Sequence, residues 1–302
     1  MKALVTAVLA GALLAGCAKE PGSTKLTEGE LVLEVDESVA PVMQKMVSDF
    51  RDQYPEAKFN VRVASARGAI ADFFNDSVRV IISGRAFNEE EKKMLEAAKI
   101  EFQQYHIAQT AVAVIAHPEV PVSFLRMGEL DSIFSGIRTR WPRGTKGLIE
   151  IVVGDLDASV NEVFRAAAMG GRRFPLTATP TPSSDSLVRY VASTPNTIGI
   201  VGVSWLKGWE HRLAVIELGG PAYRPDSTKA AGQYYSPAQA YVFQGYYPIS
   251  APVYIYTREV GRDLGLGFIS YATSAAGQKV VTREGLVPVT MPVRLVQLTT
   301  EQ

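Results

Sequence analysis

The first part of the chain alternates short apolar runs with longer segments whose apolar residues recur every three or four positions. Runs typical of buried strands lie at Leu31–Val35, Phe59–Val63 and Val78–Ile82. The segment after the first run places five apolar residues on one helical face: Met43, Met46, Val47, Phe50 and Tyr54. Alternating strands and amphipathic helices predict a parallel sheet with helices on both faces.

The same alternation recurs downstream, where Ile149–Val153 and Thr197–Val203 read as strands. Between them a helix is expected, with Val160, Val163 and Phe164 on its apolar side. The spacing therefore predicts an α/β protein with helices and mostly parallel strands along its whole length.

Parallel sheets of this kind bind ligands at the carboxyl ends of their strands, where loops meet helix N-termini. The loops at those places are Asp36–Ser38, Ala64–Gly68 and Ser83–Arg85. Serine is also a frequent helix N-cap, and capping alone accounts for four serines: Ser38, Ser65, Ser83 and Ser159. Two pairs have the spacing of a capping box: Asn88 with Glu91, and Ser159 with Glu162.

The N-terminus has the pattern of a bacterial lipoprotein signal. A positive Lys2, a short apolar run and small residues lead to Cys17, the one cysteine of the chain. We expect residues 1–16 to be removed, the Cys17 thiol to carry lipid, and residues 17–30 to form a flexible linker. The lipid would be the only membrane contact, on the periplasmic side of the envelope, with the leaflet left open.

Composition excludes several classes of function. The 31 basic and 31 acidic residues give no net charge, which argues against nucleic-acid binding. His106, His117 and His211 are too scattered for a metal site, and no cysteine remains for a disulfide. Phosphate-binding loops and hydrolase nucleophile motifs are missing too. We therefore expect neither an enzyme nor a cofactor.

Several segments together resemble the phosphate-binding proteins of bacterial phosphate ABC transporters, which have the type II periplasmic binding fold. The segments are Ser38–Pro41, Ala64–Gly68, Ile82–Arg85, Leu130–Gly136 with Trp141, Thr197–Gly202, Tyr247–Ser250 and Gly277–Val281. The resemblance implies two α/β lobes with ligand bound between them, so that binding favours closure.

The resemblance also implies a division of the chain. Lobe 1 would comprise residues 31–112 and 248–302, and lobe 2 would comprise residues 113–247. Two hinge crossovers would join the lobes, near Ala111–Pro118 and Gln244–Ser250.

The residues that grip phosphate in that family match poorly. The first-loop threonine position is Glu37, the aspartate of the third turn falls on Gly84, and the arginine falls near Gly154. Of the gripping residues, Ser65 is the one retained at a matching place. The resulting candidate ligand residues are Ser38, Ser65, Arg67, Gly68, Ser83, Arg85 and Ser159.

The charged residues near these loops support two opposite expectations about phosphate binding. Glu37, Asp155 and Asp157 would repel a phosphate dianion or cap helix N-termini themselves. Arg67 and Arg85 would compensate by paired hydrogen bonds, or are solvated surface residues; both interpretations stay open.

Two aromatic regions invite a ligand interpretation that we do not favour. Seven tyrosines gather late in the chain: Tyr234, Tyr235, Tyr241, Tyr246, Tyr247, Tyr254 and Tyr256. Their alternation with Val253 and Ile255 is more typical of strand packing than of a stacking site. The group Arg138, Arg140, Trp141 and Arg143 is interpreted as structural, with partner docking as the minority alternative.

The leading expectation is a lipid-anchored solute-binding protein that delivers phosphate or a related oxyanion to the permease of an ABC transporter. The first alternative keeps the two-lobed fold without the ligand and acts as an interaction component of an envelope complex. The second is a hydrolase with Asp36 or Glu37 as base, which lacks a nucleophile geometry.

Overall fold

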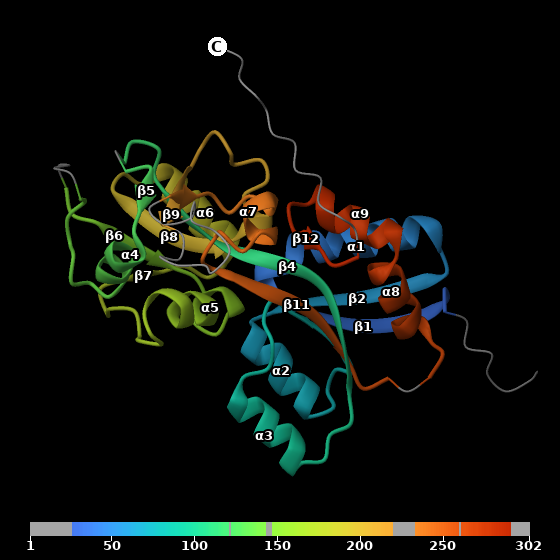
Figure 1. The fold of residues 1–302 in the computed structure, drawn as a ribbon. Coiled ribbons are helices and arrows are strands. Elements are labelled where there is room, and N and C mark those ends of the chain that lie inside the picture. Colours follow the sequence, from blue (N-terminus) through green and yellow to red (C-terminus); the bar gives the residue numbers. More distant parts are fainter. Residues whose placement is uncertain (1–25, 121, 143–146, 220–232, 260, 291–302) are drawn as a thin grey trace, which may run out of the picture.

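The chain forms two α/β lobes joined by two long strands. The structure is a computed structural model that describes residues 26–120, 122–142, 147–219, 233–259 and 261–290. Figure 1 shows β4 (Gln103–Ala116) and β11 (Ser250–Thr257) running side by side between the two lobes. The predicted α/β class and two-lobed architecture are confirmed.

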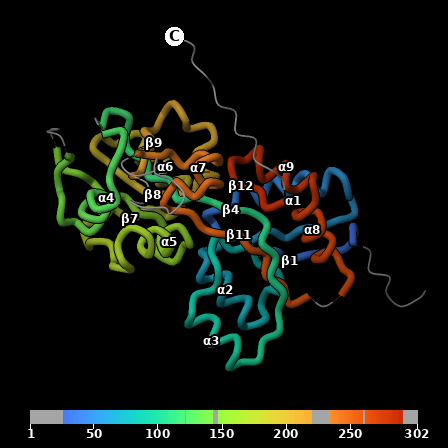
Figure 2. The backbone as a smooth tube through the Cα atoms, viewed as in Figure 1, coloured from blue at the N-terminus to red at the C-terminus, as the bar shows by residue number. Residues whose placement is uncertain are grey.

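The first lobe is built on the parallel strands that open the chain, with β1 between β2 and β3. Its elements are β1 (Gly29–Asp36), the 3-10 helix η1 (Glu37–Val39), α1 (Ala40–Gln53), β2 (Ala57–Ala64), α2 (Ala66–Phe74), β3 (Val80–Ser83), α3 (Glu89–Ala97), α8 (Leu264–Thr273), α9 (Ala275–Arg283) and β12 (Val287–Pro288). Helices α1, α8 and α9 pack together, and α2 and α3 lie on another side (Figure 2).

The second lobe places β6 parallel to both β7 and β8. Its elements are β5 (Phe124–Leu125), α4 (Met127–Phe134), β6 (Glu150–Val153), α5 (Ser159–Ala168), β7 (Thr179–Pro180), α6 (Ser184–Ser193), β8 (Thr197–Gly202), the 3-10 helix η2 (Val203–Trp205), β9 (Ala214–Gly219), β10 (Tyr234–Tyr235) and α7 (Gln239–Phe243).

Strand β4 makes the sheet continuous from one lobe to the other. It pairs with β11 over its length in the first lobe and with β8 and β9 in the second, always antiparallel. The strand order is β2-β1-β3-β11-β4-β8-β6-β7. The residue boundaries predicted for the lobes, 112/113 and 247/248, stay a prediction.

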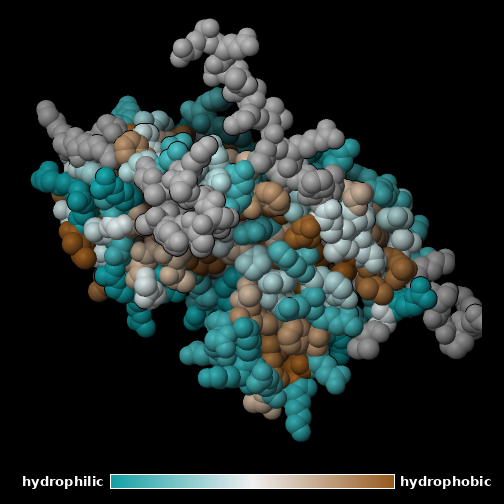
Figure 3. All heavy atoms as spheres, in the orientation of Figure 1, coloured by the Kyte–Doolittle hydropathy of each residue, from teal (hydrophilic) through white to brown (hydrophobic). Residues whose placement is uncertain are grey.

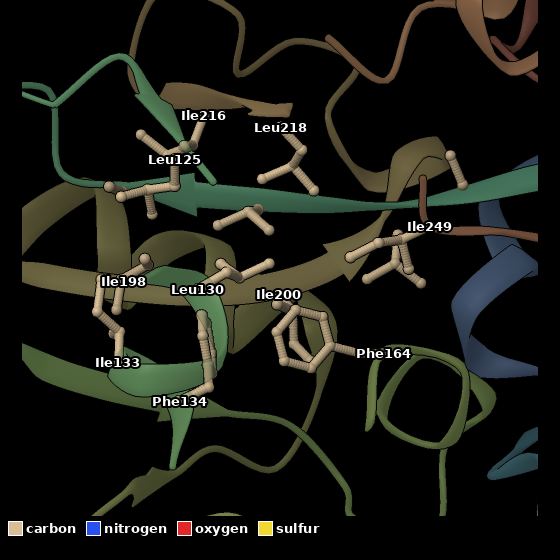
Figure 4. Close-up of a cluster of buried hydrophobic side chains, with 14 of the residues drawn as sticks. Leu125, Leu130, Ile133, Phe134, Phe164, Ile198, Ile200, Ile216, Leu218 and Ile249 are labelled. Atoms are coloured by element: carbon tan, nitrogen blue, oxygen red, sulfur yellow. The ribbon is translucent and has the colours of Figure 1, made fainter. Parts of the chain in front are cut away.

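Each lobe has its own apolar core. In the first lobe Leu33 and Val35 of β1 pack against Met43 and Phe50 of α1. In the second, residues of α4, α5 and β8 meet, as Figure 4 shows for Leu130, Phe134, Phe164, Ile198 and Ile200. Figure 3 shows a mixed surface, with apolar side chains gathered beside α2 and α3. The two lobes are therefore packed around separate apolar cores.

The predicted elements are confirmed, with shifts at their ends. β1 begins at Gly29 and pairs with Ala57, so the last residues of the predicted 17–30 linker belong to the sheet. The signal and Cys17 lie outside the described residues. None of the described helices combines the length and apolar character needed to cross a membrane.

The serine caps were predicted correctly at one place and wrongly at three. Ser65 caps α2 by accepting a hydrogen bond from Gly68 N, and the capping box of Asn88 with Glu91 is present. In contrast, α1 starts at Ala40, two residues beyond Ser38, and α5 starts at Ser159 itself, with Ala158 at its N-cap. Ser83 ends β3, six residues ahead of α3. Ser38 and Ser159 do not act as caps because their hydroxyl groups contact each other across the two lobes.

Candidate ligand site between the lobes

The carboxyl ends of strands from both lobes meet at one small cavity. It is lined by Ser38 and Gly84 from the first lobe, Ser159 and Gly202 from the second, and Thr110 from β4. Its volume is about 10 Å³, room for about one water molecule. A groove of about 270 Å³ between α2 and α3 lies outside it. The predicted position of the site is therefore closely packed.

Two serines join the lobes at this cavity. Ser38 Oγ lies 2.7 Å from Ser159 Oγ, and Ser38 and Ser159 are 3% and 1% exposed. Since neither hydroxyl caps its helix, both are available between the lobes. Thr110 Oγ1 adds a buried hydroxyl that has no hydrogen-bond partner among the described residues.

Asp36, at the end of β1, places a buried carboxyl group beside these hydroxyls. Its Oδ1 accepts a hydrogen bond from Ser38 N at 3.1 Å, and its Oδ2 accepts one from Gly84 N at 2.8 Å. Burial raises the pKa of the Asp36 carboxyl, while the hydrogen bonds from Ser159, Gly84 and Ser38 act in the lowering direction. The backbone N–H groups that could hold an oxyanion therefore hold this carboxyl group.

Two glycines allow this close approach. A Cβ at Gly84 would lie 2.6 Å from Ser38 Oγ, 2.8 Å from Ser159 Oγ and 2.9 Å from Asp36 Oδ2. At Gly202 it would lie 2.4 Å from Ser38 O. Side chains at either position would push the lobes apart or displace the Asp36–Ser38 segment.

Glu37 crosses from the first lobe to the start of α6 in the second. Its Oε1 accepts a hydrogen bond from Ser184 N at 2.5 Å, and its Oε2 accepts one from Ser184 Oγ at 2.7 Å. Burial raises the pKa of Glu37, the Ser184 hydrogen bonds lower it, and Asp36 and Asp155 raise it. The interpretation that Glu37 caps a helix N-terminus is confirmed, and the helix belongs to the opposite lobe.

Arg85 is a buried ion-pair centre, so the interpretation as a solvated surface residue is wrong. It is 6% exposed, and its two terminal nitrogens bind Glu91 at 2.7 and 2.8 Å. Its Nε lies 2.6 Å from Glu162 Oε2 on α5, without the alignment of a hydrogen bond. Burial alone would lower the pKa of Arg85, and the Glu91 and Glu162 carboxylates outweigh that effect.

Arg67 is a more exposed member of the same ion-pair network, because it also contacts Glu162. Its terminal nitrogens lie 3.0 Å from Glu162 Oε1 and 3.5 Å from Asp157 Oδ1, and its side chain is 59% exposed. Arg67 N also donates a hydrogen bond to Asp157 O. Both candidate arginines thus meet acids of the second lobe.

The remaining candidate residues make local contacts. Ser65 Oγ accepts a hydrogen bond from Gly68 N, and Ser83 Oγ accepts one from Arg85 N at 3.3 Å. The structure therefore brings together Ser38 and Ser159, and separately Arg67 and Arg85 around Glu162. Thr110, Gly202 and Ser184 were not among the predicted site residues, because a lone threonine in an apolar strand or a serine beside a proline-rich turn carries no specific signal.

Several of the aromatic residues singled out in the sequence are buried in the structure. Tyr256 of β11 is buried and stacks on Phe87 at 3.9 Å between ring centroids, which fits strand packing. Trp141 is buried, and Arg143 lies outside the described residues. Within the described ranges, no three His, Cys, Asp or Glu side chains are placed to hold a metal ion.

The chain is similar to known proteins over most of its length. The family model described as a PBP superfamily domain matches residues 20–276. The phosphate-binding protein PstS of Staphylococcus saprophyticus is 23% identical over 261 residues, 84% of this chain and 78% of that protein. PstS of Pseudomonas aeruginosa is 22% identical over 285 residues, 86% of this chain and 83% of that protein.

A solved structure shares the fold. It is a putative phosphate ABC transporter substrate-binding protein from Clostridium perfringens with bound phosphate. The TM-score is 0.75 at 19% identity, covering 87% of this chain and all of that one. The resemblance proposed from the sequence is confirmed: this chain belongs to the PBP superfamily domain family and is similar to its phosphate-binding proteins.

Proposed function

We propose that this protein is an extracytoplasmic solute-binding lipoprotein that binds phosphate or a related protonated oxyanion and delivers it to an ABC transporter. The observation that carries the proposal is the meeting of Ser38 and Ser159 hydroxyls from opposite lobes beside the Asp36 carboxyl group. Hydroxyl donors around a carboxyl acceptor suit an oxyanion that keeps a proton. The curated relatives that it resembles are named as phosphate-binding proteins.

Asp36 supports this ligand class by its position. The sequence places Gly84 where the family has an aspartate, and Asp36 Oδ2 lies 2.9 Å from where a Cβ of residue 84 would be. A carboxyl group is thus available near the same place, supplied by the neighbouring strand. It would accept a hydrogen bond from a protonated oxyanion, or donate one when it is itself protonated.

Binding on this proposal requires the lobes to separate first. The space between Ser38, Gly84 and Ser159 is about 10 Å³, and a tetrahedral oxyanion is several times larger than a water molecule. The ligand would enter the open form and would take over hydrogen bonds that Asp36 and the two serines now make to one another.

A second candidate function is favoured by how completely the chain fills its own cleft. Glu37 occupies the start of α6, and Arg85 is already held by Glu91 and Glu162. None of the described residues that line the cavity carries a positive charge. This arrangement fits a protein that has kept the fold and acts as an interaction component of an envelope complex.

We further propose that Cys17 carries the lipid that anchors the chain outside the cytoplasm, and that the protein is a binding protein, not an enzyme. The N-terminal pattern of Lys2, apolar run and Cys17 supports the anchor. The similarity to transport proteins supports the absence of catalysis.

Calorimetric titration of the chain from Ala18 onward with phosphate at low salt tests the leading function. The protein is first partly unfolded and refolded to remove any bound solute, and sulfate, which carries no proton at neutral pH, is the comparison. Micromolar or tighter phosphate binding with weaker sulfate binding is expected. Absence of both heat and thermal shift would leave the interaction role as the better account.

A further inference from the structure

Glu37 contacts the opposite lobe as an anionic ligand would. Both carboxylate oxygens bind Ser184, one at the backbone N–H and one at the hydroxyl, at 2.5 and 2.7 Å. Ser184 is the first residue of α6, where the helix has unpaired N–H groups and a partial positive charge. Ser184 itself is buried at 4% exposure, and these hydrogen bonds are partly shielded from water.

The segment that carries Glu37 is held by the second lobe at further points. Trp205 Nε1 donates a hydrogen bond to Glu37 O at 2.9 Å, and Ser204 Oγ donates one to Ser38 O at 2.8 Å. Ser159 Oγ contacts Ser38 Oγ at 2.7 Å. Three separate parts of the second lobe, α5, α6 and η2, therefore hold the two residues that follow β1, Glu37 and Ser38.

We propose that Glu37 is a built-in anion that keeps the two lobes closed without a bound solute and competes with an anionic ligand for the closed cleft. Within this segment, Glu37 is the residue whose charged side chain contacts a helix N-terminus of the second lobe. The contact joins two lobes that have separate cores. Hydrogen bonds to charged groups are stronger than neutral ones.

The competition follows from a population argument and rests on the proposed anion-binding function. An anionic solute must enter the open form. Its apparent affinity for the protein therefore falls as the fraction of open chains becomes smaller. Removal of Glu37 would raise the open fraction and remove a negative charge close to the site. Replacing Glu37 should strengthen anion binding, whereas replacing a residue that grips the ligand would weaken it.

The test measures interlobe distance and phosphate affinity in the full chain, purified in detergent. Spin labels are attached at Lys93 on α3 and Ala167 on α5, which are both exposed. They are attached through non-canonical amino acids, so that the Cys17 thiol is not labelled. Without phosphate, E37A is expected to raise the ratio of open to closed distances by about tenfold, and inorganic phosphate to bind it about tenfold more tightly than the unsubstituted chain.

D263A is the matched control, because Asp263 also caps a helix with its carboxylate, accepting a hydrogen bond from Leu266 N within the first lobe. It should leave the distance distribution unchanged. If E37A does not fold, E37Q keeps the side-chain shape, loses the charge and should shift the distances in the same direction.

Unchanged distances in a folded Glu37 variant would overturn the proposal, whether or not phosphate binds. Opening accompanied by weaker phosphate binding would overturn the competition. Opening with no phosphate binding in any of the chains would support Glu37 as the closing contact and count against the proposed phosphate function.

Discussion

The carboxyl group of Asp36 lies where a side chain at Gly84 would begin. Gly84 N donates a hydrogen bond to Asp36 Oδ2 at 2.8 Å, and a Cβ on Gly84 would be 2.9 Å from the same oxygen. The two positions therefore depend on each other: a carboxyl group can come from Asp36 because residue 84 has no side chain.

Gly84→Ala should destabilise the protein. The added methyl group would lie within 3 Å of Ser38, Ser159 and Asp36, which predicts a loss of about 1–3 kcal/mol in the free energy of unfolding. Urea denaturation measures it. G128A is the control, because a Cβ at Gly128 in α4 meets no atom within 4 Å and alanine favours a helix. Equal effects of the two substitutions would contradict the packing argument.

Titration of the Asp36 carboxyl group should lower the free energy of unfolding as the pH rises. Burial raises the pKa of its carboxyl group from the ordinary value of 3.8, so the folded chain holds this proton more tightly than the unfolded chain. Its stabilising contribution is complete below pH 3.8 and is lost as pH rises through the raised folded pKa. D36N lacks this titration.

Urea denaturation of the unsubstituted chain and of D36N, from about pH 4 to about pH 8, measures this effect. The unfolding free energy of the unsubstituted chain should decline relative to that of D36N over the range. Parallel pH profiles of the two chains would show that Asp36 does not titrate differently on folding.

Arg85→Ala should be among the more damaging changes. It would leave the carboxylates of Glu91 and Glu162, whose side chains are 11% and 15% exposed, without their buried partner. Removing one member of a buried ion pair typically costs about 3–5 kcal/mol of unfolding free energy. Thermal and urea unfolding measure the loss.

R79A provides the comparison for R85A. Arg79 also binds a carboxylate, Asp76, at 3.1 Å, but both side chains are about half exposed, at 51% and 42%. An exposed pair contributes little to stability because water screens its charges. If R79A and R85A lowered stability equally, the burial argument for Arg85 would fail.

Cys17→Ser should abolish attachment of lipid. Growth with a labelled fatty acid followed by electrophoresis of the chain measures the modification, and S23A, a change a few residues away, should keep the label. A labelled C17S chain would place the lipid on another residue, and an unlabelled original chain would remove the anchor from the proposed function.

The sequence predicted most of the fold because its evidence is local. Apolar spacing identified β1, α1, β2 and β3 within a few residues, and Ser65 and Asn88 act as the caps that their positions predicted at the starts of α2 and α3. Strand β4 was not predicted as a strand, and its pairing with β11 could not be predicted because it joins residues far apart in the chain.

The site was predicted in place but not in its contacts. The three loops after β1, β2 and β3 were found from the strand ends, yet the cap assignment of Ser38 and Ser159 was wrong because a side chain's partner depends on what packs opposite it. Arg85 remained undecided between a ligand residue and a surface residue, and its burial between Glu91 and Glu162 could not be read from the residues around it.

The sequence by itself determined the alternation of strands and helices and the loops at the strand ends, because these follow from spacing along one chain, and its resemblance to phosphate-binding proteins implied the two-lobed fold. The tertiary structure alone decided that Asp36 fills the place beside Gly84, that Glu37 caps α6 and that both arginines face acids of the second lobe. Those contacts join residues more than forty positions apart. The Asp36–Gly84 contact forms where β1 and β3 end within the first lobe, and the others form only where one lobe packs against the other.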